Sequence, residues 1–181
     1  MPAFVALLRG VNVGKANRVP MAHLRELLAA LGYTSVATLL NSGNAVFVAD
    51  DAPSARHASA IAAAIADQLG VDVPVIVKSA RELSAIVAAN PIRAEPSAHS
   101  RLIVAFVQER KSLAPLAAIE PLVRPPEQFA LGKEAAYLLC ARGIAQSKAW
   151  QALPAKAGAL VTTRNLATVL KLHGMVKALD A

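Results

Sequence analysis

Several features that usually identify a function are scarce or missing in this chain of 181 residues. Cys140 is the only cysteine, so no internal disulfide can form, and we expect a cytoplasmic protein. Aromatic residues make up only 4% of the chain, too few for a sheet that stacks nucleic-acid bases on its strands. No apolar run approaches the roughly 18 residues of a membrane-spanning helix, and the first residues lack the basic segment of a signal peptide. We therefore expect no membrane contact.

The side-chain groupings of metal sites and common catalytic centres are also missing. His23, His57, His99 and His173 stand far apart, without the spacing of metal ligands, and we expect His57 to be solvated. The Gly-x-Ser-x-Gly motif of many hydrolases is absent from the sequence. The sequence predicts no metal and no cofactor, and any catalysis would have to use Arg, Lys, Asn and Ser side chains.

Hydrophobic residues are abundant, and the charge is unevenly distributed. They make up 55% of the chain against 17% charged residues, a composition that excludes intrinsic disorder. The net charge of +7 divides into +1 for residues 1–90 and +6 for residues 91–181. A basic second half can attract an anionic partner over long range. The alternative is that this charge serves only solubility.

The first half of the sequence predicts alternating strands and helices. We expect a strand over 4–9, a helix starting near Pro20 with an apolar face of leucines, and a hairpin of strands 36–40 and 45–49. A second helix would begin with Ser54 as N-cap, followed by a strand over 72–78. The run 79–82, Ser-Ala-Arg-Glu, is a capping box that opens a third helix.

The same order of elements is predicted again after residue 100. We expect a strand over 101–107, a helix over 112–120, a hairpin of strands 127–131 and 135–140, a helix over 147–153, a strand over 159–162 and a last helix with Thr163 as N-cap. The predicted fold is therefore α+β: a tandem pair of ferredoxin-like βαββαβ halves, residues 1–91 and 92–181, each with an additional trailing helix. The alternative is one continuous α+β sheet without a repeat.

The loop after the first strand is a candidate anion site. Its glycines Gly10 and Gly14 precede a helix N-terminus, where backbone N–H groups bind anions. Arg9, Asn12 and Lys15 are further candidate ligand-binding residues, and Arg18 could add positive charge. The spacing fits neither a Walker A loop nor the dinucleotide-binding motif. The alternative is a connecting loop whose glycines only satisfy backbone angles.

Polar residues elsewhere complete the set of candidate ligand-binding positions. The hairpin tip carries three of them, although such side chains often bond their own backbone. Arg164, expected in the first turn of the last helix, opposes the helix dipole, so it should meet a carboxylate or a bound anion. The candidates outside the first loop are Asn41, Ser42, Asn44, Ser147, Lys148, Thr163, Arg164, Asn165 and Lys171.

These motifs resemble a bacterial family, domain of unknown function 1697. The resemblance rests on residues 7–14, 19–21, 31–33 and 38–44, and on Ser147-Lys148 and residues 162–165 and 168–172 near the end. It implies two ferredoxin-like halves and no established activity. Two positions depart from the family pattern: Lys15 replaces a frequent second glycine, and Leu166-Ala167 replaces Trp-Asn.

Three functions remain open from the sequence. The first is binding of a phosphate-bearing or other anionic ligand, either a nucleotide-like small molecule or a nucleic-acid backbone. The second is an enzyme that acts on a small anionic substrate with Arg, Lys and Asn. The third is a structural or interaction module whose polar motifs only lock the halves together. The oligomeric state does not follow from the sequence.

Overall fold

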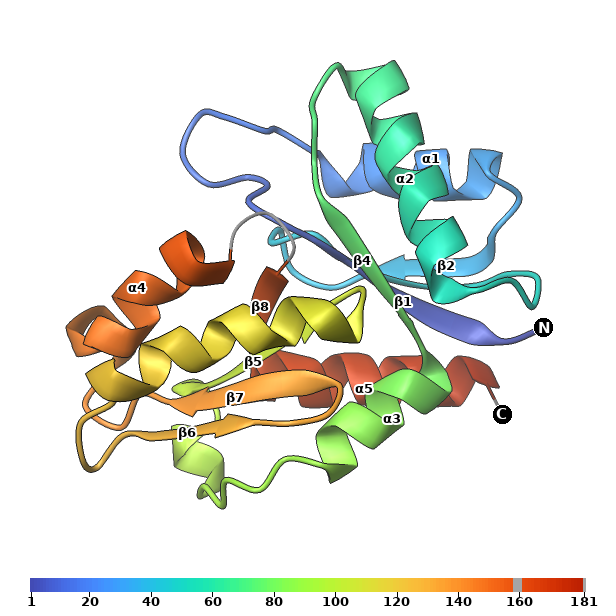
Figure 1. Cartoon of the computed structure of the whole chain (residues 1–181). Helices are drawn as coiled ribbons and strands as arrows, with labels where there is room; N and C mark the ends of the chain where they lie inside the picture. The colour runs from blue at the N-terminus through green and yellow to red at the C-terminus, as the bar shows by residue number, and fades with distance from the viewer. Residues whose placement is uncertain (158–160, 181) are drawn as a thin grey trace. The chain divides into compact units, whose positions relative to one another are not determined.

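A computed structural model of the chain describes residues 1–157 and 161–180 and contains two four-stranded antiparallel sheets with helices (Figure 1). The mixed α/β fold is thereby confirmed. By internal contacts, Met1–Ser84 and Leu172–Ala181 form a first unit, and Ala85–Lys171 form a second unit. Each unit holds one of the two sheets.

The first unit consists of a sheet with two helices over one face. The strands are β1 (Ala3–Leu8), β2 (Thr34–Thr38), β3 (Asn44–Val48) and β4 (Val75–Ser79), in the order β2-β3-β1-β4. Helices α1 (Met21–Ala30) and α2 (Ser54–Leu69) lie on one face, and α3 (Ala80–Ala88) follows β4 (Figure 1). Phe4, Ala6 and Leu8 of β1 join the core beneath these helices, while the residues between them are equally buried on the other face.

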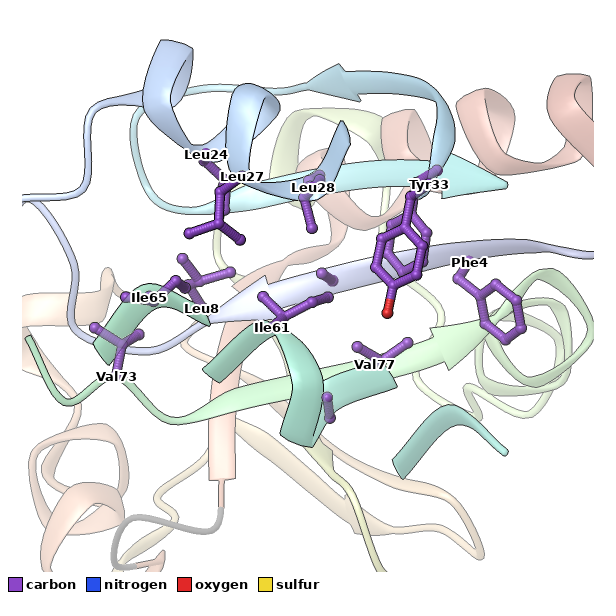
Figure 2. Packing of buried hydrophobic residues seen from close by; sticks show 14 of the residues in the cluster. Phe4, Leu8, Leu24, Leu27, Leu28, Tyr33, Ile61, Ile65, Val73 and Val77 are labelled. Carbon is purple, nitrogen blue, oxygen red and sulfur yellow. The ribbon is translucent and has the colours of Figure 1, made fainter. Parts of the chain in front are cut away.

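The apolar face of leucines predicted for the first helix is confirmed as part of the core of the first unit. Leu24, Leu27 and Leu28 of α1 are at most 1% exposed, and they pack against Ile61 and Ile65 of α2 in one hydrophobic cluster (Figure 2). Fully burying a leucine or isoleucine side chain stabilises a fold by roughly 1.5–3 kcal/mol. These side chains therefore fix both helices to the sheet.

His57 lies inside this core, so the prediction that it is solvated was wrong. It is 3% exposed, its ring centroid lies 4.6 Å from that of Phe4, and its Nδ1 lies 2.9 Å from the Tyr33 hydroxyl. The polar residues around it belong to the exposed side of α2. Position 57 itself precedes Ile61 and Ile65 by one and two helical turns, and it therefore shares their inward face.

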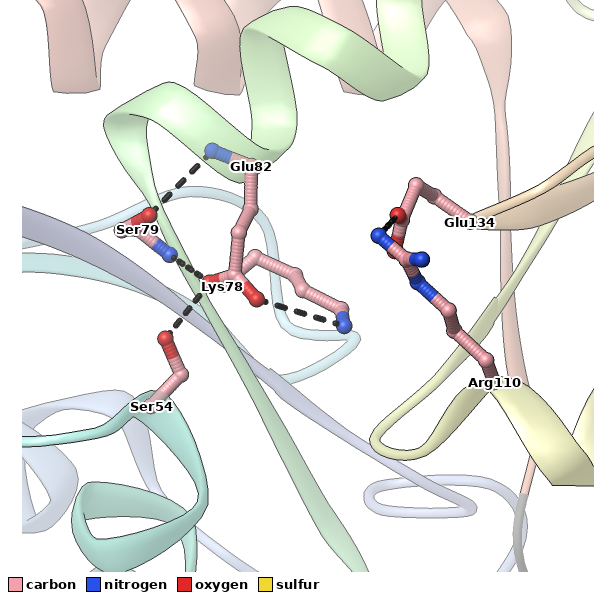
Figure 3. A network of polar contacts seen from close by, with 6 residues as sticks. All are labelled: Ser54, Lys78, Ser79, Glu82, Arg110 and Glu134. Carbon is pink, nitrogen blue, oxygen red and sulfur yellow. Dashed lines mark hydrogen bonds and ion pairs between the residues drawn. The ribbon is translucent and has the colours of Figure 1, made fainter.

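A polar network joins the ends of α2 and β4 (Figure 3). The predicted capping box is confirmed: the Ser79 N–H donates to Glu82 Oε2 at 2.7 Å, and the Glu82 N–H donates to Ser79 Oγ at 3.2 Å. The buried Lys78 places its Nζ 3.8 Å from Glu82 Oε1. Ser54 is not the N-cap of α2, because Pro53 holds that position. Its hydroxyl donates to Glu82 Oε2 at 2.5 Å instead.

The second unit repeats the strand order of the first. Its strands are β5 (Leu102–Val107), β6 (Gln128–Leu131), β7 (Ala135–Leu139) and β8 (Val161–Asn165), in the order β6-β7-β5-β8. Helix α4 (Lys148–Ala157) precedes β8, and α5 (Leu166–Asp180) follows it, with its residues from Leu172 onward counted in the first unit. Two short 3₁₀ turns, η1 (Pro96–Ala98) and η3 (Ile144–Gln146), lie in the connections.

The predicted helix over 112–120 is a 3₁₀ helix, η2 (Arg110–Leu122). Pro115 and Pro121 lie inside it, and each lacks the N–H that an α-helix needs. Its buried residues, Leu113, Leu116 and Ile119, recur every third position, which matches the three residues per turn of a 3₁₀ helix. The apolar spacing therefore suits this geometry.

The boundary between β8 and α5 differs from the prediction. Thr163 is not an N-cap: β8 continues to Asn165, and the Asn165 side-chain oxygen accepts a hydrogen bond from the Thr168 N–H at 2.9 Å. Two adjacent β-branched residues, Thr162 and Thr163, favour the longer strand. Arg164 thus lies in a strand rather than in a first helical turn. Residues 159 and 160 of the predicted strand lie outside the described residues.

The network around Glu82 predicts a specific dependence of stability on pH. Burial by itself raises the pKa of Glu82, but hydrogen bonds from Ser54 and Ser79 and the nearby Lys78 cation bring that pKa below its ordinary value of 4.5. Its ionised form therefore stabilises the fold at neutral pH, and this stabilisation is lost as the pH falls through 4.5 and then through the lower folded-state pKa. In Glu82→Gln, which cannot ionise, the urea midpoint should fall less than in the wild type between about pH 5 and pH 3.

The matched control is Glu26→Gln, a glutamate exposed on α1. Its urea midpoint should follow that of the wild type at every pH. Parallel curves for the wild type and Glu82→Gln would contradict the prediction.

Candidate functional site

Two of the predicted polar motifs meet in the first unit. The Asn12 side chain donates from Nδ2 to the Asn41 carbonyl at 2.7 Å, and the Leu8 N–H donates to the Gly43 carbonyl at 2.8 Å. The loop after β1 and the hairpin tip between β2 and β3 therefore lie side by side, although about thirty residues separate them in the sequence.

Asn12 holds the first loop in place. Its Nδ2 donates to the Val19 carbonyl at 2.9 Å as well as to Asn41, and its Oδ1 accepts from the Val19 N–H at 2.9 Å. Both of its amide hydrogens are thus used within the protein. The loop turns through left-handed backbone angles, with φ of 57° at Asn12 and 49° at Asn17, which asparagine tolerates better than most residues.

The hairpin tip is equally well fixed. Asn44 is fully buried, and its Nδ2 donates to the Leu39 carbonyl at 2.8 Å and to Ser42 Oγ at 3.0 Å. Gly43 has φ of +80°, and a Cβ there would lie 2.6 Å from the Val11 side chain, so only glycine fits. Leu40 combines φ of 60° with 57% exposure. Such a conformation is rare for a bulky residue and is often found at functional sites.

A hollow of 470 Å³ opens beside these loops, at the start of α1. The N-cap residue of α1, Pro20, has no side-chain group that can accept a hydrogen bond, and the first turn of this helix contains no acidic residue. The first helical hydrogen bond is that of the Leu24 N–H to the Pro20 carbonyl at 3.0 Å, so the N–H groups of the preceding turn face outward. We call this the loop hollow; it is lined by Asn12, Arg18, Pro20, Met21, Ala22 and Asn41.

The other candidates of the first unit lie outside the lining of the loop hollow. Lys15 and Ser42 are exposed. Arg9 is half-buried at the end of β1, and its N–H donates to the Pro74 carbonyl at 2.9 Å.

Ser147 and Lys148 begin α4 in the second unit, in different roles. Ser147 is buried, and its Oγ accepts from the Trp150 N–H at 3.1 Å, as an N-cap does. Burial raises the pKa of the neighbouring Cys140 thiol, although its hydrogen bond with Ser147 acts in the opposite direction.

Lys148 is exposed beside a hollow of 170 Å³. We call this the basic hollow; it is lined by Leu122, Arg124, Glu127, Arg142, Gln146 and Lys148.

The candidates at the end of the chain lie on β8 and α5. The Arg164 Nη1 donates to Thr162 Oγ1 at 3.0 Å and to the Thr163 carbonyl at 2.7 Å. Burial lowers the pKa of its guanidinium to about 10. Asn165 caps α5 through its side chain, and Lys171 is exposed on that helix.

Several residues of the hollows have no signal in the sequence as ligand-binding residues. Arg124 and Arg142 lie eighteen positions apart, on either side of the β6–β7 hairpin, and only the pairing of those strands brings them together. Arg18 differs from them, because the sequence already indicates it as an added positive charge of the predicted anion loop.

The described residues hold no group of three or more His, Cys, Asp and Glu side chains able to bind a metal ion. Within the same part of the chain, every helix is too short or too polar to cross a membrane.

Comparison with known proteins identifies a family and a fold. The family model described as "Protein of unknown function (DUF1697)" matches residues 1–137. A solved structure of the conserved bacterial protein SP0830 from Streptococcus pneumoniae is similar, with a TM-score of 0.79 and 24% sequence identity over 97% of this chain and 98% of that chain. Among curated proteins, none matches this chain. The similarity to the solved structure concerns the fold alone.

The hydrogen bonds of Asn12 predict a measurable contribution to stability. Asn12→Ala removes all three bonds, and we expect it to lower the free energy of unfolding by about 1–3 kcal/mol more than Asn17→Ala does. Asn17 is a matched control because its φ is also left-handed, so both alanines carry similar backbone strain, while its side chain makes one long bond of 3.5 Å to Gly10. Urea unfolding of both variants measures the difference, and equal losses would refute the assignment.

Proposed function

The chain belongs to the DUF1697 family of proteins of unknown function, and from its own residues we propose that it binds a phosphate-bearing or other anionic ligand in the loop hollow. The observation that carries this proposal is the meeting of two polar motifs around the uncapped N-terminus of α1, beside the exposed Arg18.

The loop hollow offers the groups that recognise a phosphate. Outward N–H groups and the positive end of the helix dipole favour an anion at the start of α1. Arg18 adds a guanidinium, which binds phosphate oxygens in pairs. Residues 9–20 include three cations, Arg9, Lys15 and Arg18, and no acidic residue. Asn12, Asn41 and Asn44 hold the two loops around this space, and Ser42 accepts a hydrogen bond from Asn44 at the hairpin tip.

The basic hollow supports the same ligand chemistry in the second unit. Arg124, Arg142 and Lys148 bring three positive charges to it, against the single carboxylate of Glu127. This excess agrees with the basic composition of residues 91–181. We propose it as a second contact region for phosphate groups, and Ser147 orients Lys148 there by capping α4. Thr163, Arg164, Asn165 and Lys171 complete the proposed set.

For the architecture, we propose a tandem pair of ferredoxin-like halves, residues 1–91 and 92–181. Two observations support it. Both sheets have the same strand order. The second supporting observation is a correspondence of residues: Lys78 pairs with Val5 of β1, and Arg164 pairs with Val104 of β5. The residues that follow them, Ser79 and Asn165, both cap the next helix.

If the ligand binds in the loop hollow, removing the charge of Arg18 should weaken binding, whereas removing the charge of an arginine elsewhere should not. Arg18→Gln should weaken the binding of a nucleoside diphosphate about tenfold or more, because a charge-assisted bidentate contact is lost. Arg81→Gln, which removes an exposed arginine from α3 outside the hollow, should bind like the wild type. Isothermal titration calorimetry measures both affinities.

A single-stranded oligonucleotide distinguishes the two sources of phosphate. If the ligand is a nucleic-acid backbone, the affinity for the oligonucleotide should fall steeply with salt, and Arg18→Gln should reduce the slope of log K against log salt by about one. If neither probe binds, or if both variants bind like the wild type, the proposed function is wrong.

A further inference from the structure

A second hollow of the first unit has a chemistry of its own. It measures 340 Å³, within the roughly 300–1,000 Å³ typical of small-molecule sites. It lies where the end of α1 leads into β2 and where β3 leads into α2. We call it the tyrosine hollow; its lining includes Leu31, Tyr33, Ala49, Asp50, Arg56 and His57.

A chain of hydrogen bonds from Tyr33 through His57 to the backbone of Asp50 fixes one wall of this hollow. The Tyr33 hydroxyl lies 2.9 Å from His57 Nδ1. The opposite ring nitrogen, Nε2, lies 3.3 Å from the Asp50 carbonyl and 3.6 Å from its carboxylate Oδ1. If the Tyr33 hydroxyl donates to Nδ1, then Nε2 carries the proton and faces Asp50.

Aromatic packing prevents this wall from shifting. The His57 ring lies between Phe4, Tyr33 and Phe47, with centroid distances of 4.6, 5.3 and 6.0 Å. Tyr33 also stacks on Phe47 at 4.5 Å. Since His57 and Tyr33 are buried, these two side chains form a packed wall beside Asp50.

Two opposite charges border the hollow without pairing with each other. Asp50 is 67% exposed, and Arg56 is exposed on the first turns of α2. Both lie close enough to influence the Tyr33 hydroxyl: burial raises the pKa of Tyr33, Asp50 raises it further, and Arg56 lowers it. Among the described residues, the carboxylate of Asp50 forms its ion contact with His57, and no ion pair joins it to Arg56.

We propose that the tyrosine hollow binds a small zwitterion, an amino acid or a short peptide. The ammonium group of the ligand would meet Asp50, its carboxylate would meet Arg56, and an apolar side chain would lie against Leu31 and Ala49. The balanced charge distinguishes this hollow from the loop hollow and the basic hollow, where cations predominate. A ligand that carries both charges can contact Asp50 and Arg56 at once, whereas an anion or a cation alone can pair with only one of them.

The test measures the melting temperature of the full chain with each common α-amino acid and with a set of dipeptides at millimolar concentration. A ligand that binds the folded chain raises its melting temperature by mass action. We expect at least one of these zwitterions to do so. Its N-acetyl form, which lacks the ammonium, and its amide form, which lacks the carboxylate, should bind at least tenfold more weakly.

Variants assign that binding to the tyrosine hollow. Asp50→Asn and Arg56→Gln should each reduce the affinity for the zwitterion at least tenfold, while Asp51→Asn, next in the chain and exposed, should leave it unchanged. Asp50→Asn should bind the N-acetyl form as the wild type does, since that form lacks the ammonium group that would meet the Asp50 carboxylate.

Crossed controls separate this inference from the proposed function. Arg18→Gln should leave zwitterion binding unchanged, and Arg56→Gln should leave binding of the nucleoside diphosphate unchanged. The inference is overturned if no zwitterion raises the melting temperature, if the N-acetyl or amide form binds as well, or if Asp50→Asn and Arg56→Gln bind like the wild type.

Discussion

Burial of the central strands on both faces is the constraint on which the rest of this structure depends. Every residue of β1 and β5 is at most 3% exposed, so neither face of either sheet meets water at its centre. Helices α1 and α2 cover one face of the first sheet. On the other face any polar side chain has to find partners within the protein, because an unpaired buried charge is very costly.

The last strand of each sheet carries such a charge at an equivalent place. Lys78 of β4 lies opposite Val5, and its ammonium meets Glu82, four residues later on α3. Glu82 in turn accepts from Ser54 and Ser79, so one carboxylate joins a buried lysine, a helix cap and α2. Arg164 of β8 lies opposite Val104, and the residue four positions later is Thr168. There the guanidinium donates to the Thr162 side chain and to the Thr163 carbonyl, whereas the Lys78 ammonium meets a carboxylate.

The sequence predicts this fold well where apolar residues or capping residues recur at a regular spacing. It predicts the fold poorly where contacts with residues distant in the sequence determine the local structure. Leucines at helical spacing located α1 and its buried face, and the Ser79–Glu82 pattern located the start of α3. The solvation of His57 could not be judged from its polar neighbours, since position 57 belongs to the inward row of α2. The start of α5 was misplaced because Thr163 suits both a cap and a strand, and only pairing with Ala105 decides between them. Of the candidate sites, the meeting of Asn12 with Asn41 needed the β1–β3 pairing, and the basic hollow needed the β6–β7 hairpin.

The polar residues of the two loops of the first unit divide by direction, and this division bears on the proposed anion binding. Asparagine side chains at positions 12 and 44 turn inward and use their amide groups on backbone carbonyls, which fixes loops that contain several left-handed residues. Their own capacity to bind a ligand is reduced by the same bonds. Exposed side chains, Lys15 and Arg18, lie on the backbone that these bonds hold. Cations on a fixed loop lose less conformational entropy when an anion binds, so the inward asparagines suit the proposed binding of an anion by the outward cations.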